Sequence, residues 1–543
     1  MLGPLILLLS QTVGGQYDPI LSVYGTDHFD KIGLGESDGV GDINGDGIDD
    51  FLVGNPFSTD KIVYLYSGSD LSVLRSYDNG GIGGLGKRVA HAGDVDADGA
   101  EDYLIAASDL TVNGMTWAGE VYLYSGATGT LLQTFQGQQV GHHLGYVGPA
   151  GDVDNDGHDD FFIGAYQEDW GGFEDAGVLY VYSGNTYQVL HQVHGNSDFA
   201  FWGRSFSGGF DVDLDGYDDF MAGSSDESIA HVYSGFDGSI LYTKTSTDYL
   251  DRLGNAVCLV PDSNADGTPD FCVASFGKAI GGISSVGVVE LFSGLDGSLL
   301  HAFEGDGIFG SFGENLLYAG DVDGNGNPDL AVGSSGSDIL GMQNCGSVQV
   351  FDLITRERIY LAAGSSSSRQ IGEFVRSAGD ITGDGNPNLI TGEPFYSNNG
   401  LTDNGAVHVL DFHPGLAMDQ VDISAAAGGT VNFEIDFPEH SWNLPYKLLG
   451  SHTGIGPSPF GNIEIPLSTS GVLWDAMLRQ PAPPVFTGAD GILDSNGDAT
   501  ARLVLPAGIA SGLVGSVFHF SVVSRFFNEA RQSSIAVPLT ILP

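Results

Sequence analysis

One nine-residue pattern occurs seven times in this chain of 543 residues and limits its fold more than any other feature. Each copy starts with aspartate, has polar residues at alternate positions and glycine at the sixth, and six copies end with aspartate. The copies begin at Asp42, Asp94, Asp152, Asp211, Asp262, Asp321 and Asp380, so that neighbours are 51 to 59 residues apart. Self-similarity at such a spacing is typical of repeat architectures.

Each repeat reads as four short β-strands joined by turns. An Xaa-Gly pair such as Leu34-Gly35 precedes a short strand and the acidic pattern, and a second, apolar strand follows at once, as at 161–164. A third strand alternates apolar and polar residues, as at 121–126, and a fourth, such as 131–135, ends the unit. Seven units of four antiparallel strands predict an all-β fold, a seven-bladed β-propeller over residues 16–413.

The strand count also predicts how the ring closes. No fourth strand follows the third strand of the last repeat at 407–412, whereas an unassigned segment at 19–25 resembles the fourth strand at 298–304. We therefore expect the N-terminal segment to complete the seventh blade.

The two ends of the chain lie outside the repeat. From about residue 416 the pattern stops, and segments 431–437 and 517–522 alternate like half-buried strands, so residues 416–543 are predicted to form a β-sandwich-like domain of unknown role. Residues 1–15 contain a short apolar run suited to the core of a secretory signal peptide, although no Lys or Arg precedes Lys31. We expect a secreted or cell-surface protein.

The repeats resemble a known family. Phe312-Gly313 followed by the segment 320–333 (GDVDGNGNPDLAVG) is similar to the FG-GAP repeat of integrin α-subunit propellers and of secreted bacterial relatives. Integrins resemble this pattern only in their later blades, whereas all seven repeats here have an acidic loop. The resemblance thus implies a bacterial-type relative that acts in adhesion or ligand recognition, and it gives no ground for inferring an integrin-like α/β heterodimer.

The acidic pattern has the chemistry of a calcium loop. Ca²⁺ takes six to eight oxygen ligands, and positions 1, 3, 5 and 9 supply side chains while position 7 supplies a backbone carbonyl. Glycine at position 6 lets the loop reverse. EF-hand loops need a carboxylate at position 12, where this chain has apolar residues or threonine. The nine-residue loop is therefore a calcium-loop type distinct from the EF-hand.

Up to seven Ca²⁺ ions are predicted, the seventh bound most weakly, because only Asp380 and Asp384 carry charge there. Position 7 needs only its carbonyl, so the imidazole of His158 is expected in solvent. The predicted ligands, loop by loop, are Asp42, Asn44, Asp46, Ile48 and Asp50; Asp94, Asp96, Asp98, Ala100 and Asp102; Asp152, Asp154, Asp156, His158 and Asp160; Asp211, Asp213, Asp215, Tyr217 and Asp219; Asp262, Asn264, Asp266, Thr268 and Asp270; Asp321, Asp323, Asn325, Asn327 and Asp329; and Asp380, Thr382, Asp384, Asn386 and Asn388.

The charge balance limits the partners. Asp and Glu number 70 against 18 Lys and Arg, a formal net charge of -52, which disfavours binding to nucleic acid and direct insertion into membranes. Three cysteines are too few for a disulfide framework; Cys258 and Cys272 bracket one hairpin loop and either pair or serve as small buried hydrophobic residues.

No catalytic motif stands out, since the chain lacks G-x-S-x-G, H-E-x-x-H and phosphate-loop sequences. We therefore predict a non-enzymatic protein that binds an extracellular protein or glycan. The alternatives are a glycan-binding lectin, a carbohydrate-active enzyme built on a calcium-stabilised propeller, and a purely structural surface component. The loops between second and third strands should lie on the face opposite the acidic loops, and there Trp117 and Trp170 are the predicted ligand-binding residues.

Overall fold

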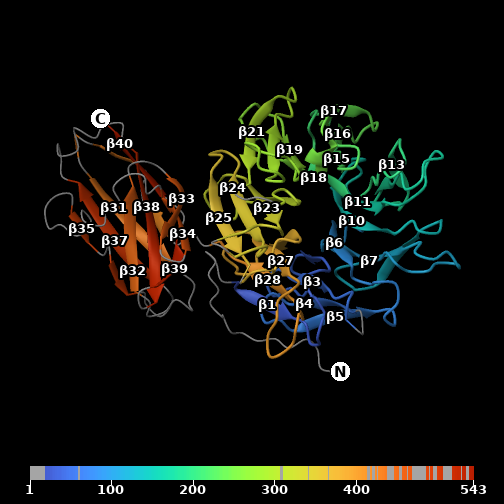
Figure 1. Ribbon diagram of the computed structural model, residues 1–543, viewed down its shortest axis with the longest axis horizontal. Helices are drawn as coiled ribbons and strands as arrows, with labels where there is room; N and C mark the ends of the chain where they lie inside the picture. Colours follow the sequence, from blue (N-terminus) through green and yellow to red (C-terminus); the bar gives the residue numbers. More distant parts are fainter. Residues whose placement is uncertain are drawn as a thin grey trace. The chain divides into compact units, whose positions relative to one another are not determined.

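The computed structural model is all-β, with one short 3₁₀ helix, η1 (Tyr249–Asp251), among the residues that it describes (Figure 1). It describes residues 19–58, 62–305, 310–339, 342–364 and 366–412 and, beyond them, the strands given below with the turn at 426–427. The predicted signal peptide at 1–15 lies outside the described residues. The chain divides into two compact units, one mainly of Pro19–Arg356 and Ser366–Asp411, the other mainly of Phe412–Pro543 with Glu357–Ser365.

Seven four-stranded antiparallel sheets confirm the predicted seven-bladed propeller. Their strands in spatial order are β2 (Ser37–Gly39), β3 (Phe51–Gly54), β4 (Ile62–Tyr66) and β5 (Val73–Asp78); β6 (Arg88–Gly93), β7 (Asp102–Ala107), β8 (Glu120–Tyr124) and β9 (Leu131–Gln136); β10 (Leu144–Gly151), β11 (Asp160–Ala165), β12 (Val178–Tyr182) and β13 (Val189–His194); β14 (Ser205–Phe210), β15 (Asp219–Ser224), β16 (Ile229–Tyr233) and β17 (Ile240–Thr245); β18 (Leu253–Val260), β19 (Asp270–Ser275), β20 (Val288–Phe292) and β21 (Leu299–Glu304); β22 (Asn315–Gly320), β23 (Asp329–Ser334), β24 (Ser347–Asp352) and β25 (Arg358–Ala363); and β26 (Val375–Gly379), β27 (Asn388–Glu393), β28 (Ala406–Leu410) and β1 (Leu21–Tyr24).

The N-terminal strand completes the seventh blade, as the strand count predicted. β1 pairs antiparallel with β28, with Leu21 opposite Val409 and Tyr24 opposite Ala406. A parallel bridge between Ile32 and Gly405 continues the contact. The two ends of the propeller sequence therefore share one sheet.

The core lies between neighbouring blades. The second strands β7, β11, β15, β19, β23 and β27 are buried at every residue, because both of their faces meet an adjacent blade. Leu104 of β7 and Phe161 of β11, for example, belong to one apolar cluster. A side chain at Gly164 would collide with the backbone of Gly203, the glycine of the next blade's Xaa-Gly pair. The repeated glycines thus allow the blades to pack closely.

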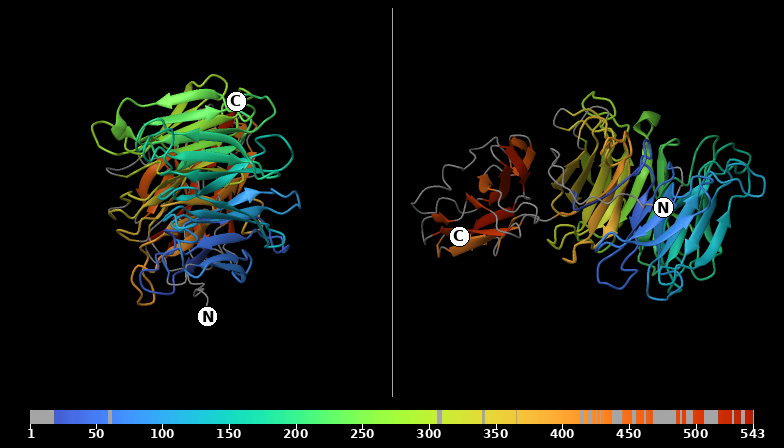
Figure 2. Two further views of the ribbon diagram at one scale, coloured as in Figure 1. Left: turned by 90° about the vertical axis from the view of Figure 1, so that its right-hand side faces the viewer. Right: turned by 90° about the horizontal axis from the view of Figure 1, so that it is seen from below.

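The loops gather on two faces of the ring. Figure 2 shows the propeller from the side, with strands that run between these faces. The loops between first and second strands and between third and fourth strands share one face, here called the acidic face. The loops between second and third strands and the links between blades lie on the opposite face.

The C-terminal unit contains two larger sheets and a hairpin, in agreement with the predicted β-sandwich. The first sheet has the order β29 (Leu416–Met418), β31 (Gly429–Asp436), β37 (Asp498–Leu505), β35 (Val485–Thr487); the second has β30 (Asp422–Ser424), β40 (Val537–Leu542), β38 (Val517–Phe526), β32 (Pro445–Ser451), β36 (Asp490–Ile492), with β39 (Glu529–Ser533) paired to β38; the hairpin joins β33 (Ile455–Phe460) and β34 (Ile463–Leu467).

Cys258, Cys272 and Cys345 are buried free thiols. Cys258 lies opposite Cys272 in the β18–β19 register but is not bonded to it. In the part of the chain that the structure describes, no helix has the length and apolar character needed to span a membrane.

Candidate functional site

Each acidic loop joins the first and second strands of its blade and is held by its own first aspartate. In the second loop, Asp94 accepts hydrogen bonds from the backbone N–H groups of Asp98 and Gly99, both at 3.0 Å. Gly99 has φ +92°, and the sixth-position glycines of all seven loops have φ between 88° and 95°. This left-handed conformation favours glycine, which explains its presence in every copy.

The ninth residue ties the loop to its own blade. Asp102 is fully buried, and one of its oxygens accepts hydrogen bonds from Val95 N–H (3.0 Å) and Asp96 N–H (3.3 Å). Its other oxygen accepts one from the Gly126 N–H (2.8 Å), in the turn between the third and fourth strands. Asp160 and Asp219 repeat this arrangement.

Burial of these carboxyl groups disfavours their ionised form. It raises the pKa of Asp102, Asp160 and Asp219 to about 7 and that of Asp329 to about 9. Such shifts occur without a bound cation, because a positive ion beside the carboxylate would favour the charged form.

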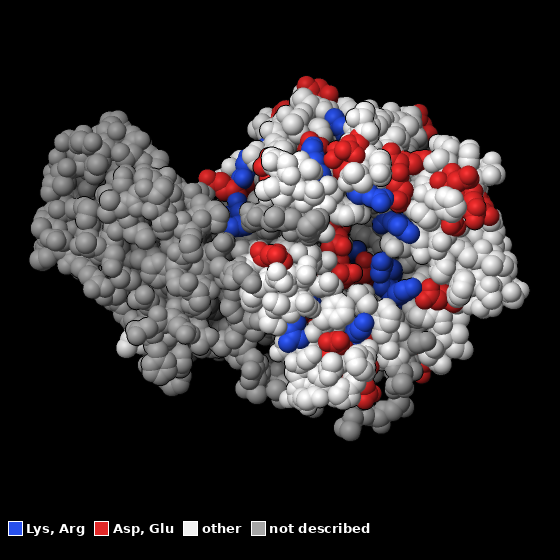
Figure 3. Space-filling model, in the orientation of Figure 1, with Lys and Arg blue, Asp and Glu red and all other residues white. Residues whose placement is uncertain are grey.

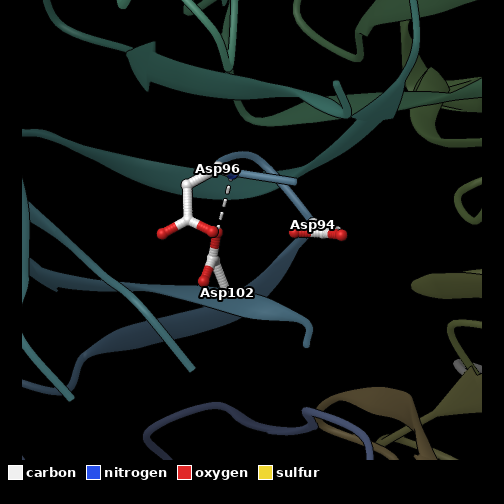
Figure 4. Close-up of side chains that lie close together, drawn as sticks. All are labelled: Asp94, Asp96 and Asp102. Atoms are coloured by element: carbon white, nitrogen blue, oxygen red, sulfur yellow. Dashed lines mark hydrogen bonds between the residues drawn. The ribbon is translucent and has the colours of Figure 1, made fainter. Parts of the chain in front are cut away.

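Four loops bring three carboxylates together. The side chains at positions 1, 3 and 9 offer oxygen atoms that all lie within 4.8 Å of one another. Figure 4 shows the three side chains of the second loop, Asp94, Asp96 and Asp102. Such a set of oxygens suits a hard divalent cation such as Ca²⁺. The four groups are Asp94, Asp96 and Asp102; Asp152, Asp154 and Asp160; Asp211, Asp213 and Asp219; and Asp321, Asp323 and Asp329.

The fifth position is not part of these groups. Asp98 is exposed and accepts a hydrogen bond from the Ala100 N–H at 3.1 Å, and Asp46, Asp156 and Asp215 do the same with their own seventh residues. The loop closes tightly around position 1 and leaves this carboxylate at its rim.

The remaining three loops carry an amide or a hydroxyl at position 3, and no group of three carboxylates forms among their described residues. In the first, Asn44 donates to Asp50 (3.3 Å), and in the fifth, Asn264 donates to Asp266 (2.8 Å). In the seventh, Asn388 takes the place of the ninth aspartate and accepts the same backbone hydrogen bond, from Ile381 N–H at 2.8 Å. The seventh loop thus keeps its backbone geometry although its ninth residue carries no charge.

The sixth loop has an additional acid that the sequence pattern did not reveal. Asp352, at the end of β24, is buried and accepts hydrogen bonds from the side-chain amides of Asn325 (3.2 Å) and Asn327 (2.9 Å). It also helps to raise the pKa of Asp323 to about 7, after the larger effect of burial. Asp352 comes from a strand 23 residues beyond Asp329, so the nine-residue window missed it.

Position 8 links one loop to the next, which was also not anticipated. Asp159 accepts a hydrogen bond from the Asp94 N–H of the preceding blade (2.8 Å), and Asp218 accepts one from Asp152 N–H (3.1 Å). Asp49 of the first blade accepts one from Asp380 N–H of the seventh (2.7 Å). The acidic loops are therefore connected across blades, including the blades where the ring closes.

The imidazole of His158 is not in solvent, so that expectation was wrong. The ring is half-buried, and its Nδ1 lies 2.8 Å from the carbonyl oxygen of Val95 in the preceding loop. The side chain at position 7 here joins two blades.

On the opposite face, the two predicted tryptophans differ. Trp117 follows a small hairpin that a bridge between Val112 and Met115 closes. Trp170 belongs to a similar hairpin, closed by its own bridge to Phe173. Trp117 is 59% exposed and stacks on His143 with ring centroids 6.0 Å apart. Trp170 is half-buried and packs against His194 at 5.1 Å.

Charged side chains meet at the start of the first strands, at the centre of the ring. Arg376 and Arg88 both contact Glu36, at 2.9 Å and 3.4 Å. Arg88 also lies over the ring of Tyr146, 4.7 Å from its centroid. Figure 3 shows Lys and Arg side chains, with Asp and Glu side chains beside them, around a hollow near the centre of the propeller.

Comparison with known proteins agrees with the fold. The model of the FG-GAP repeat matches residues 34–73, 144–182 and 377–410, in the first, third and seventh blades. Integrin alpha-5 of Xenopus laevis is 29% identical over 290 residues, which are 48% of this chain and 27% of that protein. Integrin alpha-V of Gallus gallus is 29% identical over 224 residues, 38% of this chain and 21% of that protein.

A relative of another kind is phosphatidylinositol-glycan-specific phospholipase D of Bos taurus, 30% identical over 199 residues, 31% of this chain and 24% of that enzyme. The chain thus aligns with only about a quarter of the length of these relatives. Seven blades with repeated glycines and acidic loops agree with these matches. The propeller carries FG-GAP repeats and is similar to the integrin α chains.

Proposed function

We propose that this protein is a secreted or cell-surface calcium-binding propeller that acts in adhesion or recognition of an extracellular protein or glycan and is not an enzyme. Its parts would be a signal peptide at 1–15, the propeller at 16–413 and the sandwich-like domain at 416–543. The observation that carries the calcium proposal is the meeting of three carboxylates in each of four loops.

Calcium would act structurally. In each such loop like charges lie together, and the fully buried ninth carboxylate has no basic residue among the hydrogen-bond partners described above. A divalent cation offsets this repulsion, and its binding is then coupled to folding. We extend the proposal to all seven loops, with side-chain oxygens at positions 1, 3, 5 and 9 and the carbonyl at position 7, and with the seventh site weakest.

Recognition would use the opposite face. The blades form a rigid frame with a buried core, and loops on rigid frames are where binding residues concentrate. Trp117 offers a large exposed ring and Trp170 a partly covered one. Integrin α chains among the relatives favour adhesion as the kind of activity.

Two measurements test this proposal. Melting curves with Ca²⁺ and with chelator should differ strongly, and an array of matrix proteins and glycans, probed with calcium present, should yield a ligand. The double variant Trp117→Ala, Trp170→Ala should then lose binding while its calcium content and melting temperature stay unchanged. Phe236→Ala is a matched control, since Phe236 is 63% exposed in a turn between third and fourth strands, on the acidic face.

Full binding by the double variant would refute the assignment of the binding site to this face. A melting temperature that chelator does not change would refute a structural role for calcium. One relative, phosphatidylinositol-glycan-specific phospholipase D, is by its name an enzyme, although the bond that a phospholipase D cleaves is a phosphodiester and not a glycosidic bond. The carbohydrate-active alternative therefore depends on a direct test. Release of products from any glycan bound on the array would favour it over a binding protein.

A further inference from the structure

The basic side chains of the propeller are unevenly distributed between its two faces. The acidic loops occupy one face, whereas most of the described Lys and Arg residues lie at the starts of first strands or in loops of the opposite face, Arg88, Arg204, Arg252 and Arg376 among them. The basic groups of the propeller therefore occur mainly on this face, where they lie among acids such as Glu174, Asp198 and Asp226.

Arg204 differs from the other cations of that face. Lys87 pairs with Asp109 (3.0 Å), Arg252 with Asp226 (2.7 Å) and Lys278 with Glu290 (2.9 Å). Among the described residues, no salt bridge joins Arg204 to a carboxylate. Its side chain is exposed.

Aromatic rings hold the Arg204 guanidinium in place. It lies 4.2 Å from the ring centroid of Tyr166 and 4.6 Å from that of Phe201. One hydrogen bond links the guanidinium to the Tyr166 side chain, and its further N–H groups remain to donate to a ligand. Contact with the rings also lowers the entropy that binding would cost. The Arg204 side chain therefore suits a planar anionic group.

The rings continue from Arg204 towards Trp117. The centroid of His143 lies 5.7 Å from that of Tyr166, and Trp117 stacks on His143 at 6.0 Å. The backbone supports the contact, because His143 N–H donates to the carbonyl of Trp117 at 2.9 Å. We call this row, Arg204, Phe201, Tyr166, His143 and Trp117, the cation-aromatic strip; it spans loops of blades two, three and four.

Asp109, the acid in direct contact with the strip, is already paired. Asp109 contacts His143 (3.2 Å), and these hydrogen bonds from His143 and Lys87 lower the pKa of Asp109 to about 2, so its charge is constant and already paired. The acidic loops lie at the other end of the strands. A six-residue strand spans about 20 Å, more than twice the Debye length of about 8 Å at physiological salt.

Resting on the proposed function, and naming the ligand class for the same face, we propose that the cation-aromatic strip binds an acidic glycan through the carboxylate of a uronic-acid residue. The Arg204 guanidinium would donate two parallel hydrogen bonds to the carboxylate. The free face of Trp117, opposite His143, would pack against the C–H face of a pyranose ring further along the chain. An acidic peptide would use the arginine but gain less from a flat exposed indole.

The test uses the full-length, calcium-loaded protein and isothermal titration calorimetry with three probes: trigalacturonic acid, its methyl ester and pentaglutamate. Trigalacturonic acid should bind saturably, and the ester, with the same rings but no charge, at least about tenfold more weakly. Arg204→Gln and Trp117→Ala should each weaken binding by about tenfold or more. Arg204→Lys should recover only part, because lysine lacks the planar fork.

Arg252→Gln is the matched control, an arginine of the same face that already has an acidic partner, and it should bind like the unaltered protein. Melting curves of every variant identify any that fails to fold. The proposal is overturned if trigalacturonic acid does not bind, if Arg204→Gln binds it unchanged, or if pentaglutamate binds as tightly. A failure here with a ligand still found on the array would leave recognition by this face intact and remove only the acidic-glycan assignment.

Discussion

Without bound metal, the stability of the propeller should fall as the pH rises from 5 to 8. Asp102, Asp160 and Asp219 are fully buried, and burial raises the pKa of each to about 7. In the unfolded chain an aspartate titrates near 3.9. Between these values the folded, metal-free protein keeps a proton that the unfolded chain has released, so folding is favoured at low pH and this contribution is lost as the pH rises through 7.

The magnitude follows from the size of the shift. One pH unit corresponds to about 1.4 kcal/mol per group, so from pH 5 to the folded pKa of about 7 each aspartate loses a little under about 3 kcal/mol of stabilisation. The three together give about 8 kcal/mol, a large part of the roughly 5 to 15 kcal/mol that stabilises a domain. For a unit of this length the melting temperature should fall by about 10 °C between pH 5 and pH 8.

Scanning calorimetry at pH 5, 6, 7 and 8 measures this, with the protein either freed of metal or saturated with Ca²⁺. Under the calcium proposal, Ca²⁺ would bind the ionised carboxylates, and its presence should abolish the fall. His91, whose pKa its Asp38 partner raises to about 9 against the effect of burial, titrates in both series, so the difference between them isolates the loops. A metal-free protein at least as stable at pH 8 as at pH 5 would refute the reasoning.

Three further predictions concern the loops and the closure of the ring. Asp156→Ala should lower calcium binding measured by calorimetric titration more than Asp384→Ala, because the third loop has four acids at its ligand positions and the seventh two; the reverse order would contradict the ranking. Asp49→Ala should cost about 1 to 3 kcal/mol in denaturant unfolding, since it leaves the Asp380 N–H without its carboxylate acceptor, and an unchanged midpoint would show that this link is dispensable. Deletion of residues 16–27 should expose the edge of β28 and cause aggregation in size-exclusion chromatography, and a stable monomer would argue against the clasp.

The acidic loops were predictable because their geometry is local. Asp94, Gly99 and Asp102 lie within nine residues, and the hydrogen bonds that their carboxylates accept and the positive φ of the glycine need nothing from outside the loop except one turn of the same blade. The clasp at β1 was predictable for a different reason: a repeat that lacked one strand left only one segment to supply it. Regular spacing thus carried information about contacts between distant residues.

Other features depend on packing between repeats, which no nine-residue window contains. Asp159 reaches the Asp94 N–H in the preceding blade, and Asp352 reaches the sixth loop from another strand. Whether an aromatic ring is exposed also depends on the link between blades, so Trp117 and Trp170 read alike in the sequence but differ in the structure. In the C-terminal unit, the parallel pairing of β30 with β40 joins segments that share no recognisable pattern.

The pairing of β1 with β28 also sets the order of events during biosynthesis. Leu21 is made early, yet its partner Val409 emerges only after nearly the whole propeller has been synthesised. Because contacts so distant in sequence form slowly, the last blade is expected to close after the others and to limit the folding rate. Until then the β1 segment has an unpaired edge, and a chain released before Val409 is translated retains that aggregation-prone edge permanently.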